Sequence, residues 1–138
     1  MTSKKAYEYA LQNGAEEKTR NIACFNAHYA YLYAKDIDKG PREDTRKAAC
    51  KSPYSAYYYA RDVDQGPNDD TQKAACRSAF CAYWYAFDID NGPTENTRKA
   101  ACKEARSAYK YAKNIDKGPR RSTRKAACKN IYYAYLYV

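Results

Sequence analysis

The sequence repeats itself with a period of 26 residues. The pattern Ala-Tyr-x-Tyr-Ala recurs from Ala30 onward and Thr-x-x-Ala-Ala-Cys from Thr45 onward, with later copies at Ala56, Ala82, Ala108, Thr71, Thr97 and Thr123. A unit of this length cannot enclose a hydrophobic core alone, so each copy must bury its apolar side against the next one. The sequence therefore predicts a stack of similar units.

Each unit is expected to hold two short helices. Helix A begins at a capping residue such as Asn26, Ser52, Ser78 or Asn130 and ends before a Gly-Pro pair. Helix B begins at that proline, carries acids in its first turn and ends at a basic residue. We predict an all-α fold, a right-handed, HEAT-like α-solenoid of about five helix pairs plus a final unpaired helix. It forms a single domain, 1–138, with repeats at 1–25, 26–51, 52–77, 78–103 and 104–129 and a terminal helix at 130–138.

The composition favours an acidic partner. The net charge of +9 at pH 7 suits nucleic acid, an anionic membrane surface or an acidic protein, and charge alone does not choose among them. No stretch approaches the roughly 20 apolar residues of a membrane span, and the start of the chain lacks the apolar core of a signal peptide. We therefore expect a cytoplasmic protein with no membrane partner.

Five of the six cysteines share one position of the repeat, namely Cys24, Cys50, Cys76, Cys102 and Cys128. Stacked helices lie about 8–10 Å apart, beyond the roughly 7 Å between Cα atoms that a disulfide can bridge. We expect these five to be reduced and buried, and Cys81 to be the one thiol that reacts in the native protein. A bond between Cys76 and Cys81 across a turn is the alternative.

Helix A has one side that repeats and one that varies. At 100° per residue, Ala56, Tyr59, Ala60 and Val63 share a side that every copy repeats, which indicates the core. The opposite side differs between copies, and a solenoid usually presents its binding surface at such positions. It holds His28, Leu32 and Lys35, then Tyr54, Tyr58 and Arg61, then Phe80, Trp84 and Phe87, then Arg106, Lys110 and Lys113.

This varying side predicts a protein-binding surface. Clustered Trp, other aromatics and Arg with a polar rim are typical of interaction hot spots. Other copies hold Glu, Leu, Tyr or Lys in the slot of Trp84, so we expect its indole to be exposed. The alternative is that neighbouring helices cover Phe80 or Phe87 as ordinary packing. The candidate protein-binding residues are Tyr54, Tyr58, Arg61, Phe80, Trp84, Phe87, Arg106 and Lys110.

Helix B presents cations in two columns. Thr45, Ala48 and Ala49 are predicted to face inward, which turns Lys47 and Lys51 outward in a pattern that later copies repeat. Cations late in a helix offset its dipole, so a solvated face is the usual explanation. The last copy has no acid between Lys117 and Asn130, which favours phosphate binding. The candidate residues are Lys99, Lys103, Arg120, Arg121, Arg124, Lys125 and Lys129.

Paired aspartates end helix A at Asp36 and Asp38, Asp62 and Asp64, and Asp88 and Asp90. The helix dipole disfavours negative charge there, so we expect compensation by Arg46, Arg98 and Arg124 or by the amino end of helix B. Asp-x-Asp-x-Gly also begins calcium loops, but the later ligand positions are missing and Pro follows Gly.

No catalytic set emerges from the sequence. His28 is the only histidine, and there is no Gly-rich phosphate loop or Gly-x-Ser-x-Gly turn. A cysteine ladder without converging histidines is not a zinc site. We therefore predict no catalytic residue, metal or cofactor, with an enzyme built from Tyr, Asp and Lys as the alternative.

The terminal helix is apolar, with Tyr135, Leu136, Tyr137 and Val138. A terminal solenoid repeat normally has a polar outer side, so this helix favours a homo-oligomer or burial against a partner. The alternative is that it simply closes the core.

Two stretches, SPYSAYYYARDV from Ser52 and AYLYAKDI from Ala30, resemble the short tandem repeats of uncharacterised proteins from large phages and giant viruses. The resemblance covers nearly the whole chain and implies a HEAT-like solenoid of viral origin, located in the host cytoplasm, but no activity or site residue. The chain departs from these repeats in its Gly-Pro pairs, where they often have Gly-Arg, and in its cysteine ladder. A designed repeat protein is the alternative, although designers avoid free cysteines.

We predict a non-catalytic scaffold that binds another protein through the varying side of helix A. Sequence-independent nucleic-acid binding through helix B and self-assembly by end-to-end stacking are the alternatives.

Overall fold

A computed structural model describes residues 1–137, which form helices and turns with no strand. Eleven α-helices follow one another as repeated pairs within these residues. The predicted all-α repeat solenoid is thus confirmed. The chain divides into two compact units, one comprising Met1–Ala74 and the other beginning at Ala75. We describe each unit by itself.

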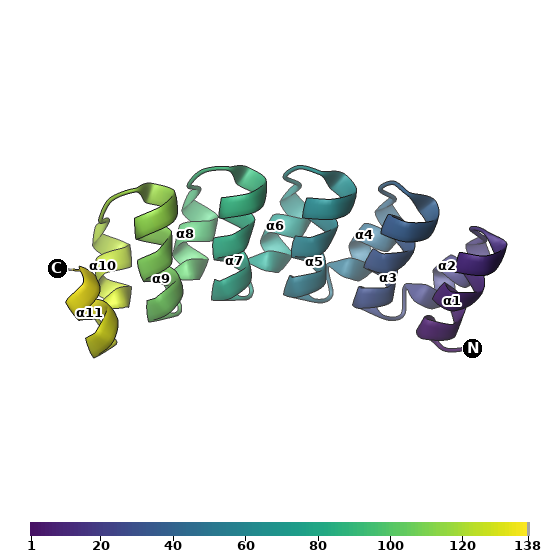
Figure 1. Ribbon diagram of the computed structural model, residues 1–138, viewed down its shortest axis with the longest axis horizontal. Coiled ribbons are helices and arrows are strands. Elements are labelled where there is room, and N and C mark those ends of the chain that lie inside the picture. Colours follow the sequence, from purple (N-terminus) through teal and green to yellow (C-terminus); the bar gives the residue numbers. More distant parts are fainter. Residues whose placement is uncertain (138) are drawn as a thin grey trace. The chain divides into compact units, whose positions relative to one another are not determined.

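In the first unit the A helices lie side by side, and each B helix packs on its own A helix (Figure 1). The A helices are α1 (Ser3–Asn13), α3 (Ala27–Tyr33) and α5 (Pro53–Tyr59), and the B helices are α2 (Glu17–Ala23) and α4 (Glu43–Ala49). Helix α6 (Asp69–Ala75) ends at the unit boundary. A π-helical turn extends α3 and α5, as η1 (Ala34–Asp38) and η2 (Ala60–Asp64).

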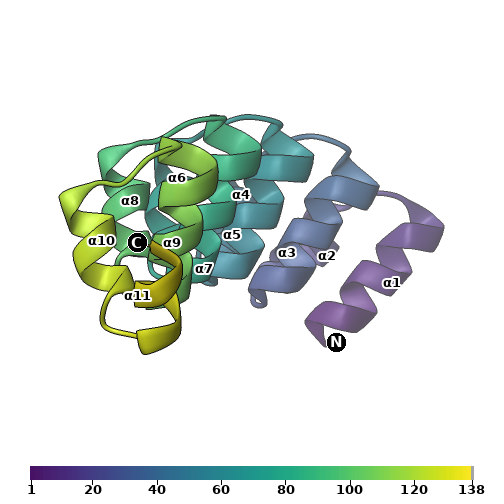
Figure 2. The same ribbon diagram turned by 60° about the vertical axis from the view of Figure 1, so that its left-hand side comes forward.

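The second unit repeats this arrangement. Its A helices are α7 (Ala79–Tyr85), α9 (Ala105–Tyr111) and α11 (Ile131–Tyr137), and its B helices are α8 (Glu95–Ala101) and α10 (Arg121–Ala127). The π-helical turns η3 (Ala86–Asp90) and η4 (Ala112–Asp116) extend α7 and α9. Helix α11 packs against both α9 and α10, and Figure 2 shows it in yellow beside α10.

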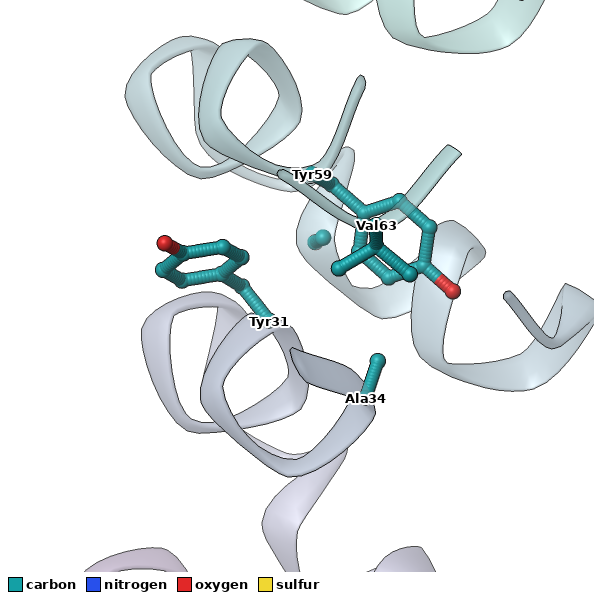
Figure 3. Close-up of a cluster of buried hydrophobic side chains, with 5 residues drawn as sticks. Tyr31, Ala34, Tyr59 and Val63 are labelled. Carbon is teal, nitrogen blue, oxygen red and sulfur yellow. The ribbon is translucent and has the colours of Figure 1, made fainter. Parts of the chain in front are cut away.

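The core side of helix A is the predicted one. Ala56, Tyr59 and Ala60 are fully buried, and Val63 is nearly so. Figure 3 shows how Tyr31 and Ala34 of one A helix approach Tyr59 and Val63 of the next. Since small alanines alternate with tyrosines, neighbouring helices approach closely and the large rings fill the space between them. The core is therefore a thin seam that every repeat extends.

The predicted starts of helix A are confirmed. The side chains of Asn26, Ser52 and Ser78 each accept a hydrogen bond from a backbone N–H of the first turn. Asn130 accepts one from the N–H of Tyr132 in the same way. Pro53 occupies the first turn of α5, where a missing N–H leaves no hydrogen bond unmade.

Helix B begins later than the sequence predicted. Helix α4 starts at Glu43, two residues after Pro41, and the extended residue Arg42 is its N-cap. The reason lies outside the helix. The hydroxyl of Tyr59 accepts a hydrogen bond from the N–H of Arg42 and thereby fixes the first turn.

The sequence also gave no sign of the π-helical turns that end helix A. After each turn a non-glycine residue adopts the left-handed conformation, at Lys39, Gln65, Asn91 and Lys117, with φ of 54–56°. The glycine comes one residue later, and the N–H of Gly40 donates back to the carbonyl of Ala34. In the first unit this wide turn carries both aspartates of a pair to the junction with the preceding repeat, as at Asp62 and Asp64.

Candidate protein-binding surface

Within each unit, a pair of hydroxyls fixes the angle between helices at the junction of neighbouring repeats. Tyr59 Oη and Thr45 Oγ1 lie 2.8 Å apart, and both side chains are fully buried. The same contact joins Tyr33 to Thr19, Tyr111 to Thr97 and Tyr137 to Thr123. Because each tyrosine also lies in the core, these contacts hold the varying side of helix A in a fixed orientation.

Arg46 compensates Asp64, as predicted, whereas Arg98 pairs with Asp116, which lies outside the predicted aspartate pairs. Arg46 binds Asp64 with two hydrogen bonds of 3.0 and 2.6 Å, and Arg98 binds Asp116 with bonds of 2.9 and 2.6 Å. Arg20 does the same with Asp38, a pair that the sequence analysis missed. Arg124 differs from the prediction, since no carboxylate of residues 1–137 pairs with it, and its guanidinium lies over the Tyr137 ring.

The first aspartate is held by a tyrosine of the preceding A helix. Tyr7 Oη donates to Asp36 at 2.6 Å, and Tyr31 Oη donates to Asp62 at 2.5 Å. Burial and the hydrogen bond to Asp62 raise the pKa of Tyr31. Burial opposes ionisation of Asp62, but hydrogen bonds from Arg61 and Tyr31 outweigh it, so the pKa of Asp62 is lowered. The spacing of these tyrosines in the sequence gave no signal for this contact.

The varying side of α5 in the first unit forms a small aromatic and basic group. Tyr54 is 50% exposed, and Arg61 is also exposed. The Arg61 guanidinium lies 4.9 Å from the centre of the Tyr58 ring and forms two hydrogen bonds with Asp62. Tyr58 is partly buried because its ring stacks on Tyr31, with centroids 5.8 Å apart. These contacts hold the group rigid, and it presents the Tyr54 ring and the Arg61 guanidinium to solvent.

In the second unit α7 and its π-helical turn bring Phe80, Trp84 and Phe87 together. The Trp84 ring meets Phe80 at a centroid distance of 6.3 Å and Phe87 at 5.6 Å, both edge to face. Phe80 is 50% exposed and Phe87 46% exposed. Edge-to-face contacts of this kind favour one fixed arrangement of the three rings.

The expected exposure of Trp84 was wrong. Its indole is partly buried, because it packs edge to face on Tyr83 and against the core cluster that includes Ala101 and Tyr111. Several other repeats hold non-aromatic residues at the position of Trp84, so the fold does not require an aromatic side chain at this position. When an aromatic side chain is present, it packs over the core between neighbouring helices. The open apolar area belongs to the two phenylalanines.

The two cations of α9 differ in position. Lys110 is partly buried, and its Nζ lies 6.0 Å from the centre of the Tyr83 ring, which also contacts Trp84 and Phe87. Arg106 is exposed. Tyr83 therefore connects the aromatic group of α7 to the basic side of α9.

The candidate phosphate-binding residues are all exposed, namely Lys99, Lys103, Arg120, Arg121, Arg124, Lys125 and Lys129. Thr45, Ala48 and Ala49 are buried, as the two-column pattern of helix B requires. Lys103 Nζ donates to the carbonyl of Cys76 at 3.3 Å, and Lys51 does the same to Cys24 in the first unit. These two lysines thus neutralise the carbonyl end of the preceding B helix.

The cysteine prediction was wrong about burial. Cys81 is the buried thiol, Cys128 is exposed, and Cys24, Cys50, Cys76 and Cys102 are partly buried. None of the six forms a disulfide, so no bridge joins Cys76 to Cys81. The repeated cysteine ends helix B, where its side chain lies in the turn, whereas Cys81 takes the inward position of buried Ser55 and Ser107. Burial raises the pKa of Cys24 and of Cys76 from 9.0 to about 11.

Helix α11 leaves much of its apolar surface open. Ile131 is 91% exposed and Tyr135 is 79% exposed, while Tyr133 and Tyr137 pack partly on the cluster of Ala108, Ala126 and Ala127. Val138, which the sequence analysis placed in the same surface, lies outside the described residues.

No family model matches the chain, and no curated protein or solved structure matches it. The resemblance to phage and giant-virus repeats therefore stays a prediction. Within residues 1–137, no helix is long and apolar enough to cross a membrane. In the same residues, no three His, Cys, Asp or Glu side chains gather where they could hold a metal ion.

Proposed function

We propose that the chain is a non-catalytic repeat scaffold that binds another protein through the varying side of helix A. The observation that carries the proposal is the pair of half-exposed rings, Phe80 and Phe87, fixed on either side of Trp84. Exposed aromatic area held rigid in advance loses little conformational entropy on binding. We place this activity in the cytoplasm.

The charges around the rings favour an acidic partner. Arg106 and Lys110 come from the helix that packs beside α7, and the chain as a whole carries +9. Rim charges of this kind act mainly on the association rate and on the choice of partner. A partner with an apolar anchor and a ring of acids fits this surface. The Tyr54, Tyr58 and Arg61 group offers the same chemistry on the first unit.

Replacement of the two exposed rings tests the proposal without loss of the fold. The wild-type chain and the Phe80→Ser, Phe87→Ser double variant are used to capture partners from a lysate of the native host, treated with nuclease. Phe25→Ser is the matched control, because Phe25 is 82% exposed in the turn between α2 and α3. We expect the partner to bind the wild type and the control, and to bind the double variant at least about 30-fold more weakly, as hot-spot loss implies. Equal capture by all three would contradict the proposal.

Nucleic-acid binding is the second candidate, and the seven exposed cations favour it. Such binding would not depend on base sequence and would weaken steeply with salt, with a slope of about 0.9 per neutralised phosphate on duplex DNA. Charge reversal at Lys125 and Lys129 should reduce that slope, while the same change at Lys4 and Lys5 of α1 serves as the control. Affinity weaker than about 10⁻⁴ M at physiological salt would leave the cations as a solvated face.

A further inference from the structure

An open cleft lies between the neighbouring B helices α8 and α10 of the second unit, which Figure 2 shows side by side. It has a volume of about 420 Å³. Helix α8 and the residue after it supply Glu95, Arg98, Lys99 and Cys102 to the lining, and α10 supplies Ser122. A hydrogen bond links Ser122 to Cys102. The lining therefore combines two cations with a hydroxyl, and all three can donate hydrogen bonds to an anion.

The first unit contains the equivalent groove, between α2 and α4, with different charges. The repeat places Lys99, Arg121 and Ser122 in the second unit where the first unit has Asn21, Glu43 and Asp44. Each of these three replacements makes the groove of the second unit more positive. Because the helices repeat, the two grooves differ in their side chains and not in the framework that carries them.

The two equivalent thiols, Cys24 and Cys102, respond to this difference. Burial raises the pKa of both. At Cys24 the neighbouring Asp44 carboxylate adds to the rise in pKa. At Cys102 the hydrogen bond with Ser122 and the charge of Lys129 oppose the rise. A negative charge is therefore more favourable in the cleft between α8 and α10 than in the equivalent groove of the first unit.

The donors of the cleft are only partly used within the chain. Arg98 uses two N–H groups to bind Asp116, and a guanidinium has five. No carboxylate of residues 1–137 forms an ion pair with Lys99. The Ser122 hydroxyl can rotate toward a bound anion. Glu95, the acid of this lining, is exposed, so its carboxylate can turn into solvent.

We propose that this cleft binds a phosphate group, with Arg98, Lys99 and the Ser122 hydroxyl as its donors. The site rests on the nucleic-acid function proposed as the second candidate, because the surrounding charges favour a strand as the source of the phosphate. Further exposed cations lie along α10 and just after it, namely Arg121, Lys125 and Lys129. A single phosphate cannot contact cations spread over two helical turns, whereas a strand presents one phosphate after another.

Protection of Cys102 from N-ethylmaleimide tests the site, because this thiol lines the cleft. The native chain is labelled alone and with an oligothymidine of about 15 nucleotides, with pyrophosphate or with polyglutamate, and mass spectrometry follows each cysteine. We expect oligothymidine to slow the labelling of Cys102 at least about ten-fold and that of Cys24, in the equivalent groove, less than about two-fold.

The other two probes identify the ligand. Protection by pyrophosphate only at higher concentration than by oligothymidine supports a strand as the source, whereas stronger protection by pyrophosphate assigns the same phosphate site to a small phosphorylated compound. Equal protection by polyglutamate of matched charge would overturn the proposal in favour of an acidic protein. No protection by either phosphate probe would also overturn it.

Ser122→Asp restores the acid of the equivalent groove and provides the sharpest variant. It should weaken the binding of oligothymidine, measured by fluorescence anisotropy, at least about ten-fold. Asn96→Asp is the matched control, since it adds the same charge at the equivalent exposed position of α8, and it should weaken binding less than about two-fold. Lys99→Gln should lower the salt slope by about one, as the loss of one phosphate contact does.

The variants also separate this site from the function on which it rests. If the wild type binds oligothymidine but Ser122→Asp costs no more than Asn96→Asp, nucleic-acid binding stands and the cleft is not its phosphate site. A wild-type chain that binds neither oligothymidine nor pyrophosphate would contradict both. Circular dichroism of each variant shows whether the fold is kept, and Ser122→Ala, which leaves the charge unchanged, should weaken binding several-fold if the hydroxyl is a donor.

Discussion

Tyr59 Oη lies 2.8 Å from Thr45 Oγ1 and 3.0 Å from the backbone N of Arg42. One phenol hydroxyl therefore joins helix A of one repeat to the first turn of helix B in the repeat before it. This contact explains why a chain with so few large aliphatic side chains uses tyrosine in its core. The ring supplies apolar area, and the hydroxyl satisfies the helix N-terminus that the core buries.

Tyr59→Phe should reduce the free energy of unfolding by about 1–3 kcal/mol, because it leaves the N–H of Arg42 without its buried partner and removes the contact with the Thr45 hydroxyl. Urea denaturation followed by circular dichroism measures the change. Tyr9→Phe is the control at a 43% exposed position of α1 and should stay within about 0.5 kcal/mol of the wild type. A Tyr59→Phe effect no larger than that of the control would show that the hydroxyl contact is not stabilising.

Stability should fall at alkaline pH. The folded chain raises the pKa of Tyr7 from 10.0 to about 12 and that of Cys24 and Cys76 from 9.0 to about 11. A raised pKa means that the folded state favours the protonated form, so the stabilisation is complete below pH 9 and is lost as pH rises toward 12. The urea midpoint should therefore decrease between pH 8 and pH 11. Tyr7→Phe should decrease less steeply above pH 10, and a midpoint independent of pH would contradict the expected shifts.

The sequence predicted the framework because the framework is periodic. The positions of Ala56, Tyr59 and Val63 hold Ala, Tyr and a β-branched residue in all four internal copies, and this helical spacing alone identifies the seam. The π-helical turn escaped prediction because Gln65, rather than the neighbouring Gly66, takes the left-handed conformation. Glycine is the usual signal for that conformation, and here it is displaced by one residue.

The candidate site was predicted only in part, because exposure depends on contacts between repeats. The varying positions were read correctly as outward, yet Trp84 and Tyr58 are partly buried through neighbouring rings. Sequence spacing within one helix cannot show such coverage. The burial of the cysteines could not be predicted for a similar reason. The repeated cysteine lies at the end of helix B, where the chain turns away, so the inward face of the helix does not decide its burial. The equivalence of Cys81 with Ser55 and Ser107 was the available signal for its burial.

Thiol reactivity should follow this corrected order. Cys128 is exposed and should react first with iodoacetamide in the native protein, while Cys24 and Cys76 should react slowly at neutral pH because their pKa is raised to about 11. Cys81 should react only after unfolding. Mass spectrometry of labelled peptides measures the order. Fast labelling of Cys81 in the native chain would contradict the burial of that thiol.

The apolar surface of α11 should cause self-association at micromolar concentration. Ile131 and Tyr135 are largely exposed, and Leu136 is 39% exposed. Leu136→Glu should shift the chain toward monomer in analytical ultracentrifugation, because it places a charge in the contact. Leu11→Glu separates two modes of assembly, since Leu11 is exposed on α1. Both changes should weaken end-to-end stacking, whereas only Leu136→Glu should weaken a dimer formed through two α11 helices. A strict monomer at high concentration would leave α11 as the simple end of the core.

The single tryptophan allows the corrected burial of Trp84 to be measured before any partner is known. Because the indole packs on Tyr83 and between Phe80 and Phe87, its emission should be quenched by iodide only in part, and less than that of a free tryptophan derivative. Trp84→Ala should reduce the free energy of unfolding by about 1–2 kcal/mol, less than the 3–5 kcal/mol typical of a fully buried large aromatic. Phe87→Ala, at a 46% exposed position, should cost less than Trp84→Ala. If Trp84→Ala left stability unchanged and iodide quenched the indole fully, the edge-to-face group on α7 would not be fixed in solution, and the rigid surface proposed for protein binding would lose its basis.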